Sequence, residues 1–314
     1  MNKKILITGG AGFIGANFVY KFLDLGYAIT VAERKGVDLW RLEKIERKIT
    51  TVLIDLADYK NVERCIIKTH PDIVIHLAAY GAYQRFQQDV TATVNTNLLG
   101  TINLVNACQK MSVQAFVNTG TNSEYGIKEK PMKETDILEP NNLYGITKAA
   151  VTLYCQMMAH KYGFPVVTIR PFAVYGQLEE PGRLIPDIIK ACLTNTELKL
   201  SSPASVRDFI FIEDLIDGYL AAIKKIKKIK GEVLNLGTGK QYSIQDVVTI
   251  VKKITKSSLK PRYGTIKKAQ TEPATWVADI SKAKKMLVWK PSHTLEEGLK
   301  KDIEWFKDNL KFYA

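Results

Sequence analysis

Tyr144 and Lys148 have a spacing that suits proton transfer. They stand four residues apart in a segment whose pattern continues as a helix to about residue 161. Side chains at positions i and i+4 share one face of a helix, one turn apart. A phenol with its ordinary pKa of about 10 is a weak base near neutrality, and a neighbouring ammonium lowers that pKa by attraction. The spacing alone also fits an exposed aromatic–lysine pair, so the interpretation depends on other residues.

Polar side chains follow a predicted strand at residues 114–118. The chain continues there as Thr-Gly-Thr-Asn-Ser-Glu-Tyr-Gly, residues 119–126. Ligands of open parallel sheets bind beyond the carboxyl ends of the strands. We therefore expect Thr121, Asn122 and Ser123 to face a ligand.

A glycine turn near the N-terminus is typical of a dinucleotide site. An apolar run leads into Gly9-Gly10-Ala11-Gly12-Phe13-Ile14-Gly15, and an amphipathic run leads out of it. Gly9 allows a sharp turn, Gly12 leaves room for phosphates, and Gly15 allows close packing of helix against strand. The spacing is GxxGxxG, and glycines also mark ordinary turns. We expect this stretch, Phe13 and Ile14 included, to contact the cofactor.

Two adjacent residues give opposite indications about which dinucleotide binds. Glu33 follows the second predicted strand, residues 28–32, where a carboxylate accepts from the ribose 2′-hydroxyl and favours NAD. Arg34 comes next, and a guanidinium pairs with the 2′-phosphate of NADP. The cofactor is therefore expected to be NAD or NADP.

The ends of the next two strands complete the expected cofactor site. Asp55 and Leu56 follow a short strand at 51–54, where a carboxylate can reach the adenine amino group, although a plain turn aspartate fits equally well. Small residues in Leu77-Ala78-Ala79 allow the backbone close to a cofactor ribose. His76, just before them, is expected to pack at the strand end and not to bind a ligand.

Strands and helices alternate along the first half of the chain. A helix at 13–25 follows the first strand, and a long helix at about 90–110, which carries Asn97 and Gly100, follows the fourth. This alternation predicts an α/β fold with a doubly wound parallel sheet.

The second half is expected to build a smaller, substrate-binding lobe. The predicted domains are residues 1–170, which bind the dinucleotide, and residues 171–314, of which about 205–240 return to the first domain. The expected elements are strands at 165–169 and 233–236 and helices at 185–193 and 213–224.

The glycine turn, Thr121 and Tyr144-x-x-x-Lys148 together resemble the extended short-chain dehydrogenase/reductases that modify nucleotide sugars, the NAD-dependent epimerase/dehydratase family. The resemblance spans nearly the whole chain and implies a Rossmann-like fold. Further matching stretches are Asn97-x-x-Gly100-Thr101, Arg170-Pro171-Phe172-Ala173-Val174-Tyr175-Gly176, Arg207-Asp208-Phe209 and Ala278-Asp279.

This resemblance implies the role of each site residue. Tyr144 would be the acid/base, Lys148 would also hold the nicotinamide ribose, and Thr121 would hydrogen-bond the reacting oxygen. Asn97 would support the helix or a proton relay, although a structural asparagine fits equally well. Arg207 would clamp the substrate diphosphate, with the remaining substrate contacts from Tyr80, Asn122, Ser123 and Phe172.

The resemblance also implies a homodimer and shows one departure. Relatives pair the helices at about 90–110 and 143–161 into a four-helix interface. A second phosphate or nucleotide arginine is usual in the family, but here that position is Ala269, beside Lys267 and Lys268. The departure leaves the nucleotide base open.

The reaction is narrowed by the residues after Thr121. Sugar-nucleotide 4,6-dehydratases carry Asp-Glu there, whereas Asn122-Ser123 supply neither a general acid nor a good base. Two enzyme interpretations remain, an NAD(P)H-dependent 4-ketoreductase and an NAD-dependent 4-epimerase. Local matches to CDP-abequose and CDP-paratose synthases, such as Ala79-Tyr80-Gly81, favour the reductase. An interpretation of another class is a non-catalytic dinucleotide-binding or RNA-binding relative.

Composition and charge limit the kinds of partner and the cellular location that we expect. The chain has 314 residues and a net charge of +13, but its lysines are spread out, and the run at 224–230 is expected to be the solvated end of a helix. The four cysteines form no CxxC or Cys/His cluster, so neither disulfides nor a metal site are indicated. No apolar run reaches membrane-spanning length. We expect a cytoplasmic protein without nucleic-acid or membrane partners.

Overall fold

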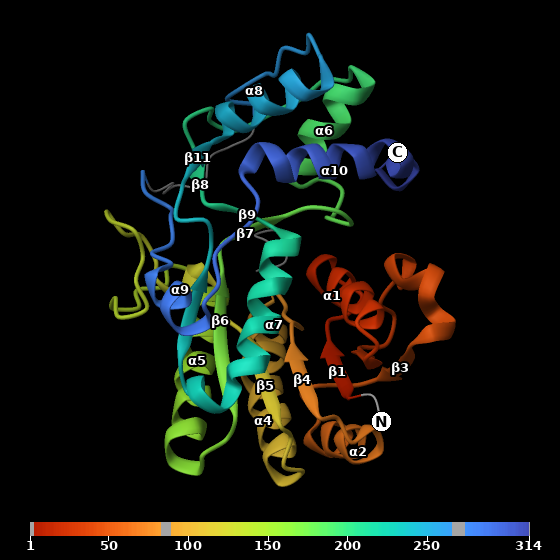
Figure 1. Cartoon of the computed structure of the whole chain (residues 1–314), viewed down its shortest axis with the longest axis vertical. Coiled ribbons are helices and arrows are strands. Elements are labelled where there is room, and N and C mark those ends of the chain that lie inside the picture. The colour runs from red at the N-terminus through yellow and green to blue at the C-terminus, as the bar shows by residue number, and fades with distance from the viewer. Residues whose placement is uncertain (1–2, 83–88, 266–273, 314) are drawn as a thin grey trace.

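A seven-stranded parallel sheet forms the centre of the molecule (Figure 1). The computed structural model describes residues 3–82, 89–265 and 274–313. The strand order is β10-β6-β5-β4-β1-β2-β3. The strands are β1 (Lys4–Thr8), β2 (Ala28–Glu33), β3 (Thr50–Leu53), β4 (Ile73–His76), β5 (Ala115–Thr119), β6 (Val166–Pro171) and β10 (Val233–Leu236). The order reverses direction beside β1, so the predicted doubly wound α/β sheet is confirmed.

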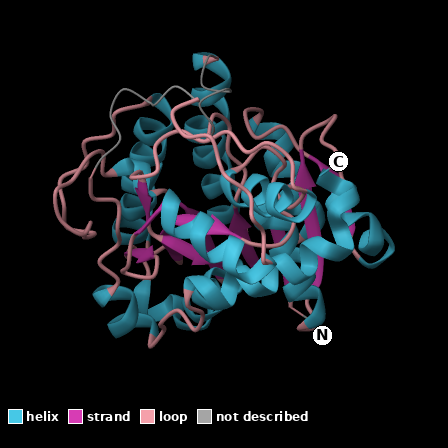
Figure 2. Ribbon diagram, turned by 90° about the horizontal axis from the view of Figure 1, so that it is seen from above, coloured by secondary structure: helices cyan, strands magenta, loops and turns pink. Residues whose placement is uncertain are grey.

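Helices cover both faces of the sheet, as the view from above shows (Figure 2). One face carries α1 (Phe13–Asp24) and α7 (Ile212–Ile229), and the other carries α2 (Tyr59–Thr69), α4 (Gly100–Lys110) and α5 (Leu143–Tyr162). Neighbouring strand residues enter opposite cores: Leu6 packs with α2 and α4, whereas Ile5 and Ile7 pack with α1. Strands buried on both faces explain why they read as continuous apolar runs.

A smaller lobe lies beyond the carboxyl ends of the strands (Figure 1). Its helices are α6 (Leu184–Thr194), α8 (Ile244–Thr255) and α10 (Leu295–Asn309), whereas α9 (Ser281–Leu287) packs against α7 and the edge strand β10 of the sheet. Two short strand pairs join it, β7 (Ala173–Tyr175) with β9 (Phe209–Phe211) and β8 (Val206–Arg207) with β11 (Tyr242–Ser243). The expected return of the chain to the sheet at 233–236 is confirmed by β10, which pairs with β6.

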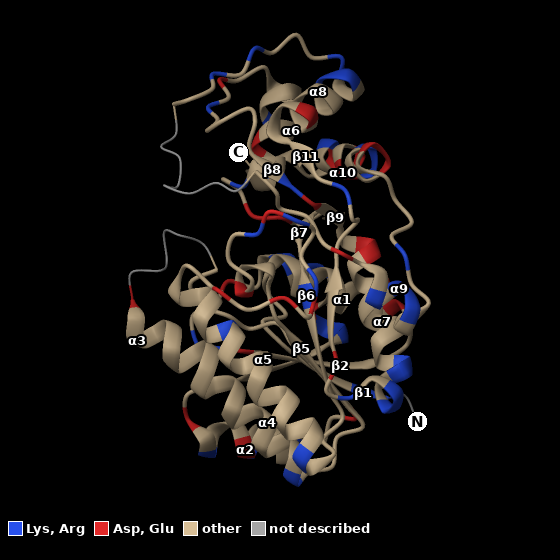
Figure 3. Ribbon diagram, turned by 90° about the vertical axis from the view of Figure 1, so that its left-hand side faces the viewer, with Lys and Arg blue, Asp and Glu red and all other residues tan. Residues whose placement is uncertain are grey.

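Several expected elements differ in their bounds or in the type of helix, and β3, for example, ends one residue before the expected 54. Glu33 is the last residue of β2, not the residue after it. The expected long helix at about 90–110 is confirmed in extent, but it is not α-helical throughout: α3 (Val90–Thr93) passes through a π-helical turn, η3 (Val94–Leu99), into α4. Helix α7 runs five residues beyond the expected 224. Its lysines at 224, 227 and 228 face solvent while Ile226 and Ile229 stay buried, and Figure 3 shows Lys and Arg positions spread over several elements of the ribbon.

All four cysteines are buried free thiols. Within the described ranges, the helices are too short or too polar to cross a bilayer.

Asp302 on α10 is a buried carboxylate with unusual surroundings. It is fully buried, and neither of its oxygens has a hydrogen-bond partner among the described residues. Burial raises its pKa to about 8, and burial likewise raises the pKa of Glu179 to about 8, with Arg183 opposing and Asp302 adding to the rise. In the unfolded chain Asp302 ionises near its ordinary pKa, so between about pH 4 and 8 the folded state holds a proton that the unfolded state lacks. Stability is therefore lost as pH rises through this window.

Replacing Asp302 with Asn is expected to stabilise the protein, because the amide needs no proton to stay neutral. The gain in unfolding free energy should grow between pH 5 and pH 8 and reach about 2 kcal/mol or more at pH 8. Thermal melts of both proteins across this range test it. Asp308→Asn, at an exposed position of the same helix, is the control and should give no pH-dependent gain. An equal gain at every pH would contradict the expectation.

Candidate active site

A cavity of about 1030 Å³ lies at the carboxyl ends of the strands, between the sheet and the smaller lobe. It brings the predicted site residues together, with the exception of Asn97. The predicted residues that line it are Gly9, Gly12, Phe13, Ile14, Gly15, Glu33, Arg34, Asp55, Leu56, Leu77, Ala78, Ala79, Tyr80, Thr121, Asn122, Ser123, Tyr144, Lys148, Phe172 and Arg207.

The glycine turn forms one end of the cavity. Gly9 has a φ of +71°, and a Cβ there would lie 2.7 Å from the Ala78 nitrogen, while a Cβ at Gly15 would lie 2.1 Å from the Gly9 oxygen. These two glycines are therefore required by the fold. Gly12 is the N-cap residue of α1 and has an ordinary φ of −72°. A Cβ there would lie 3.4 Å from the Gly9 oxygen, so the fold itself leaves room for one. The space at Gly12 is thus left for a ligand at the helix N-terminus.

Gly12→Ala should therefore leave the fold intact and weaken dinucleotide binding. We expect at least about a tenfold rise in the cofactor Kd, since a methyl group would occupy space beside the helix N-terminus. Titration of NAD and NADP by calorimetry, with a thermal melt to check folding, measures this effect. Ala11→Ser is the control, because it changes the same turn at a residue that does not line the cavity. Gly26→Ala would not serve, because the φ of Gly26 is +82° and alanine would be strained there. Unchanged affinity in Gly12→Ala would place the phosphates elsewhere.

Glu33 and Arg34 both line the cavity, but Glu33 is buried and hydrogen-bonded whereas Arg34 is exposed. Glu33 is only 8% exposed, and its Oε1 accepts a hydrogen bond of 2.7 Å from the Ala11 nitrogen. Burial raises its pKa, and the bond from Ala11 and the charge of Arg34 oppose the rise. Arg34 is exposed and also lines a neighbouring hollow of about 430 Å³. Asp55, on the edge of both, accepts a hydrogen bond of 2.9 Å from the Ala57 nitrogen, as a turn aspartate does.

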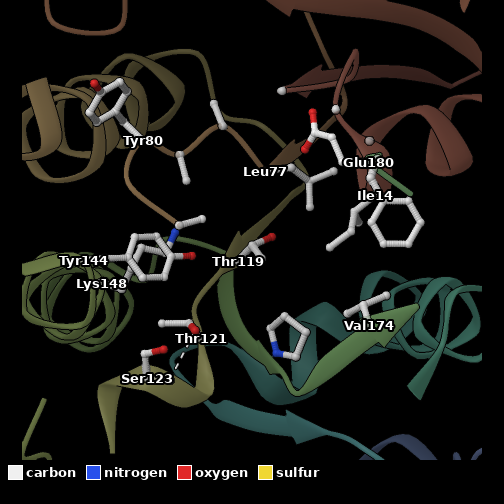
Figure 4. A pocket seen from close by; sticks show the side chains of 18 of the residues that line it. Ile14, Leu77, Tyr80, Thr119, Thr121, Ser123, Tyr144, Lys148, Val174 and Glu180 are labelled. Carbon is white, nitrogen blue, oxygen red and sulfur yellow. Dashed lines mark hydrogen bonds between the residues drawn. The ribbon is translucent and has the colours of Figure 1, made fainter. Parts of the chain in front are cut away.

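Helix α5 carries Tyr144 and Lys148 into the cavity (Figure 4). The helix begins at Asn142, whose Oδ1 accepts a hydrogen bond of 2.8 Å from the Gly145 nitrogen. Lys148 is only 2% exposed. Burial lowers its pKa to about 8, and the carboxylate of Glu124 opposes this. The pair therefore combines a half-buried phenol with an ammonium that titrates near neutrality.

Thr121 faces the same space from the loop after β5. Its hydroxyl oxygen accepts a hydrogen bond of 3.2 Å from the Ser123 nitrogen, and it donates to Asn122 Oδ1 over 3.3 Å. Figure 4 shows Thr121 and Ser123 beside Tyr144, while Glu180 lies near Ile14 at the far side.

Asn97 lies behind the cavity and does not line it. Its amide group accepts from the Tyr80 nitrogen over 2.8 Å, and donates to the Tyr80 oxygen over 2.9 Å and to the Thr147 hydroxyl over 3.1 Å. These bonds occupy its side chain in joining the wall at Tyr80 to α5. Asn97 lies in the π-helical turn η3, which was not visible from sequence.

His76 is a fully buried strand-end histidine, as expected. Its ring nitrogens lie 2.6 Å from the Thr8 hydroxyl and 2.8 Å from the Thr101 hydroxyl, which itself donates to the Asn97 carbonyl. Burial, and secondarily the charge of Lys148, lowers its pKa to about 3. His76 is therefore neutral and helps to tie the strand ends to the helix beneath the cavity.

Arg207 and Trp276 line the part of the cavity toward the smaller lobe. The guanidinium carbon of Arg207 lies 5.7 Å from the centre of the Trp276 ring, and one of its nitrogens donates to the Val206 oxygen over 2.6 Å. Sequence analysis missed Trp276, although its place two residues before Ala278-Asp279 was a usable signal. The predicted departure at Ala269, with Lys267 and Lys268, lies outside the described residues.

Residues 5–237 match the NAD dependent epimerase/dehydratase family. The chain belongs to this family. The fold, the family and the assignment to an extended short-chain dehydrogenase/reductase type of enzyme are therefore confirmed, while the role of each site residue remains a prediction.

Individual family members are similar over nearly their whole length. A UDP-glucuronate 4-epimerase of Thermodesulfobacterium geofontis is 30% identical over 98% of this chain and 97% of that protein. The dTDP-D-glucose 4,6-dehydratase of Homo sapiens is 28% identical over 98% of this chain and 91% of its own. A UDP-glucose 4-epimerase of Thermotoga maritima with UDP-glucose superposes with a TM-score of 0.90 at 29% identity, covering 98% and 99% of the two chains. A Bacillus cereus UDP-glucuronic acid 4-epimerase with UDP-glucuronic acid and NAD gives 0.87 at 28% identity, covering 98% and 99%.

Proposed function

We propose that this chain catalyses NAD(P)-dependent hydride transfer at C4 of a nucleotide-diphosphate hexose, and that its reaction is reduction of a 4-keto-6-deoxyhexose. One observation carries the proposal: the glycine turn and the Thr121, Tyr144 and Lys148 side chains line a single cavity. A dinucleotide fits at the turn because Gly12 leaves the N-terminus of α1 open.

Each of the three polar side chains has a role in the proposed step. NAD(P)H, when bound, supplies the hydride. The Tyr144 phenol gives its proton to the C4 oxygen as that oxygen gains charge. The Lys148 ammonium favours the phenolate that remains, and the Thr121 hydroxyl hydrogen-bonds the same oxygen and orients it.

Arg207 and Trp276 suit the nucleotide end of the substrate. A guanidinium offers a planar pair of donors to a diphosphate, and an indole offers a face on which a base stacks. The UDP-sugars in the complexes of the Thermotoga maritima and Bacillus cereus epimerases support a nucleotide sugar here.

Dehydration is not proposed, because the chain lacks the acid and base it needs beside Thr121. Asn122 and Ser123 occupy those positions. Among the described lining residues the carboxylates belong to Glu33, Asp55, Glu179 and Glu180, and Figure 4 shows Glu180 across the cavity from Ser123.

A second candidate is 4-epimerisation, in which C4 is oxidised and the hydride returns to the other face of the ketone. The similarity to UDP-glucuronate and UDP-glucose 4-epimerases favours it. Both reactions use the same three side chains, so the site geometry supports each.

One experiment distinguishes the candidates. The purified protein is denatured and any released cofactor identified, and fresh enzyme then receives a nucleotide 4-keto-6-deoxyhexose with NADH or NADPH or, separately, UDP-glucose alone. Cofactor oxidation only with the ketosugar supports the reductase and shows which of the two dinucleotides the enzyme uses. Stoichiometric bound NAD with interconversion of UDP-hexoses supports the epimerase. If neither substrate is turned over, both the reductase and the epimerase candidates are contradicted.

We also propose a homodimer formed through α4 and α5. Large apolar side chains are exposed around these two packed helices, namely Leu99 (41%), Ile146 (51%), Leu153 (58%) and Met157 (39%). Exposed apolar area of this kind on neighbouring helices is typical of an interface.

Leu153→Glu is therefore expected to convert a dimer into a monomer at micromolar concentration, because two charges would be buried at the contact. Light scattering of the wild type and the variant measures the mass. Ile137→Glu changes a side chain that is 78% exposed outside these helices and should stay dimeric. A monomeric wild type would contradict the proposal.

A further inference from the structure

Glu124 is a fully buried carboxylate just outside the cavity, and no proposed catalytic step uses it. Its Oε1 accepts a hydrogen bond of 2.9 Å from the Thr121 nitrogen. Its Oε2 accepts from the Thr152 hydroxyl over 2.8 Å and from the Arg170 guanidinium over 2.8 and 2.7 Å. One side chain thus binds the loop after β5, helix α5 and strand β6.

These bonds join the two elements that carry the proposed catalytic residues. Thr121 lies on the loop, and Tyr144 and Lys148 lie on α5, the helix of Thr152. The carboxylate is also packed against the backbone, because a Cβ at Gly120 would lie 2.5 Å from its Oε1. A shift of Glu124 would therefore move the loop relative to the helix.

Arg170, on strand β6, holds the Glu124 carboxylate in place. It is 2% exposed, and its guanidinium carbon lies 4.5 Å from the centre of the Tyr125 ring. The Tyr125 hydroxyl donates to Asn235 Oδ1 over 2.7 Å, and the Asn235 amide donates to the Met132 oxygen over 2.9 Å. A buried ion pair stabilises a fold little more than apolar residues of similar size at the same positions would. Stability alone therefore does not account for the Glu124–Arg170 pair, and a positioning role does.

We propose that Glu124 is a positioning residue that holds Thr121 in register with Tyr144 and Lys148. The inference rests on the proposed function and deepens it, because it names a residue that acts through all three catalytic side chains without touching the substrate.

Glu124 also acts on Lys148 through its charge. The titratable groups around Lys148 include Tyr144 and Cys155 on α5, His76 on β4, and Glu124, which is itself bound to Arg170. Burial keeps His76 neutral, with a pKa of about 3, and keeps the Cys155 thiol protonated, with a pKa of about 12. The Glu124 carboxylate opposes the effect of burial on Lys148 and so helps that side chain to stay charged near neutrality.

Glu124→Gln is the first test. The amide keeps the volume but cannot accept from Thr121, Thr152 and Arg170 together, so we expect kcat to fall about ten- to a hundredfold. The substrate KM and the cofactor Kd should stay unchanged, because Glu124 does not line the cavity. The alkaline limb of the kcat profile should move to lower pH. A folded variant with wild-type kcat, or with the loss confined to KM, overturns the proposal.

Thr152→Val is the second test and leaves the buried ion pair intact. It removes only the bond between α5 and Glu124, at a position 1% exposed, and we expect a severalfold loss of kcat without a change in KM. Thr93→Val is the matched control, since Thr93 is fully buried and its hydroxyl donates to the Asp89 carbonyl of its own helix end. If Glu124→Gln does not fold, a wild-type kcat in Thr152→Val overturns the proposal.

A substrate-independent measurement separates this proposal from the proposed function. The ε-carbon of Lys148 is followed by NMR in lysine-labelled protein and assigned by its absence in Lys148→Met. We expect its titration midpoint to be lower in Glu124→Gln than in the wild type, and unchanged in Asp302→Asn, which replaces an equally buried carboxyl group on α10, away from Lys148. If no nucleotide sugar is turned over but the midpoint moves, the function fails and the coupling of Glu124 to Lys148 stands. An unmoved midpoint overturns the coupling.

Discussion

Tyr144→Phe is expected to lower kcat at least about a hundredfold, because it removes the hydroxyl that we propose exchanges a proton with the C4 oxygen while hydride moves. The phenyl ring keeps the packing of α5, where Tyr144 is half-buried at the cavity wall. The cofactor Kd and the substrate KM should therefore change little. Steady-state kinetics with the substrate that the experiment under Proposed function identifies measures the effect.

The control for this variant is Tyr162→Phe, at the last residue of the same helix. The Tyr162 side chain is 52% exposed and does not line the cavity, so its hydroxyl should not matter. Near-wild-type kcat in Tyr144→Phe, with the control equally active, would show that Tyr144 is not the acid.

Lys148→Ala is expected to have an effect of similar size, at least about a hundredfold in kcat. Without the ammonium the Tyr144 phenolate loses the charge that favours it. Loss of the expected contact with the nicotinamide ribose should also raise the cofactor Kd. Because Lys148 is almost completely buried, Lys148→Met, which keeps the length of the stem, shows whether a cavity in the core explains part of the loss.

The pH dependence of kcat tests whether the charge of Lys148 is needed. Burial lowers its pKa to about 8, so the side chain is charged below that pH and loses its charge above it. The kcat of the wild type should accordingly fall as pH rises through about 8, and this limb should be missing in Lys148→Met. Lys161→Ala, at an exposed position of the same helix, should keep the limb. A limb that persists in Lys148→Met would belong to another group.

The parts that sequence analysis predicted well depend on short-range pattern. The spacing of Gly9, Gly12 and Gly15 and the i, i+4 relation of Tyr144 and Lys148 are local, and the buried strands read as apolar runs. The parallel sheet then places strand ends at one edge, which is why residues from six different strand ends meet in one cavity.

The parts that it missed depend on contacts between distant segments. Glu124 meets Arg170 across 46 positions, and the Asn97 side chain meets Thr147 across 50. A buried carboxylate in a loop looks from sequence like any acidic turn residue, and a π-helical turn carries no signal in apolar periodicity. Trp276 reaches the cavity only because the chain returns past Arg207 from the far end of the molecule.

The central claim is that Tyr144 and Lys148 couple proton transfer to hydride transfer at C4 of a nucleotide sugar. Its most direct test is a single turnover with cofactor carrying deuterium at the transferable position of the nicotinamide and a nucleotide 4-keto-6-deoxyhexose, in the wild type and in Tyr144→Phe. We predict deuterium at C4 of the sugar within one turnover of the wild type, and transfer at least about a hundredfold slower in the variant with both ligands bound. Deuterium at another carbon, or equal rates in the two proteins, would contradict the account.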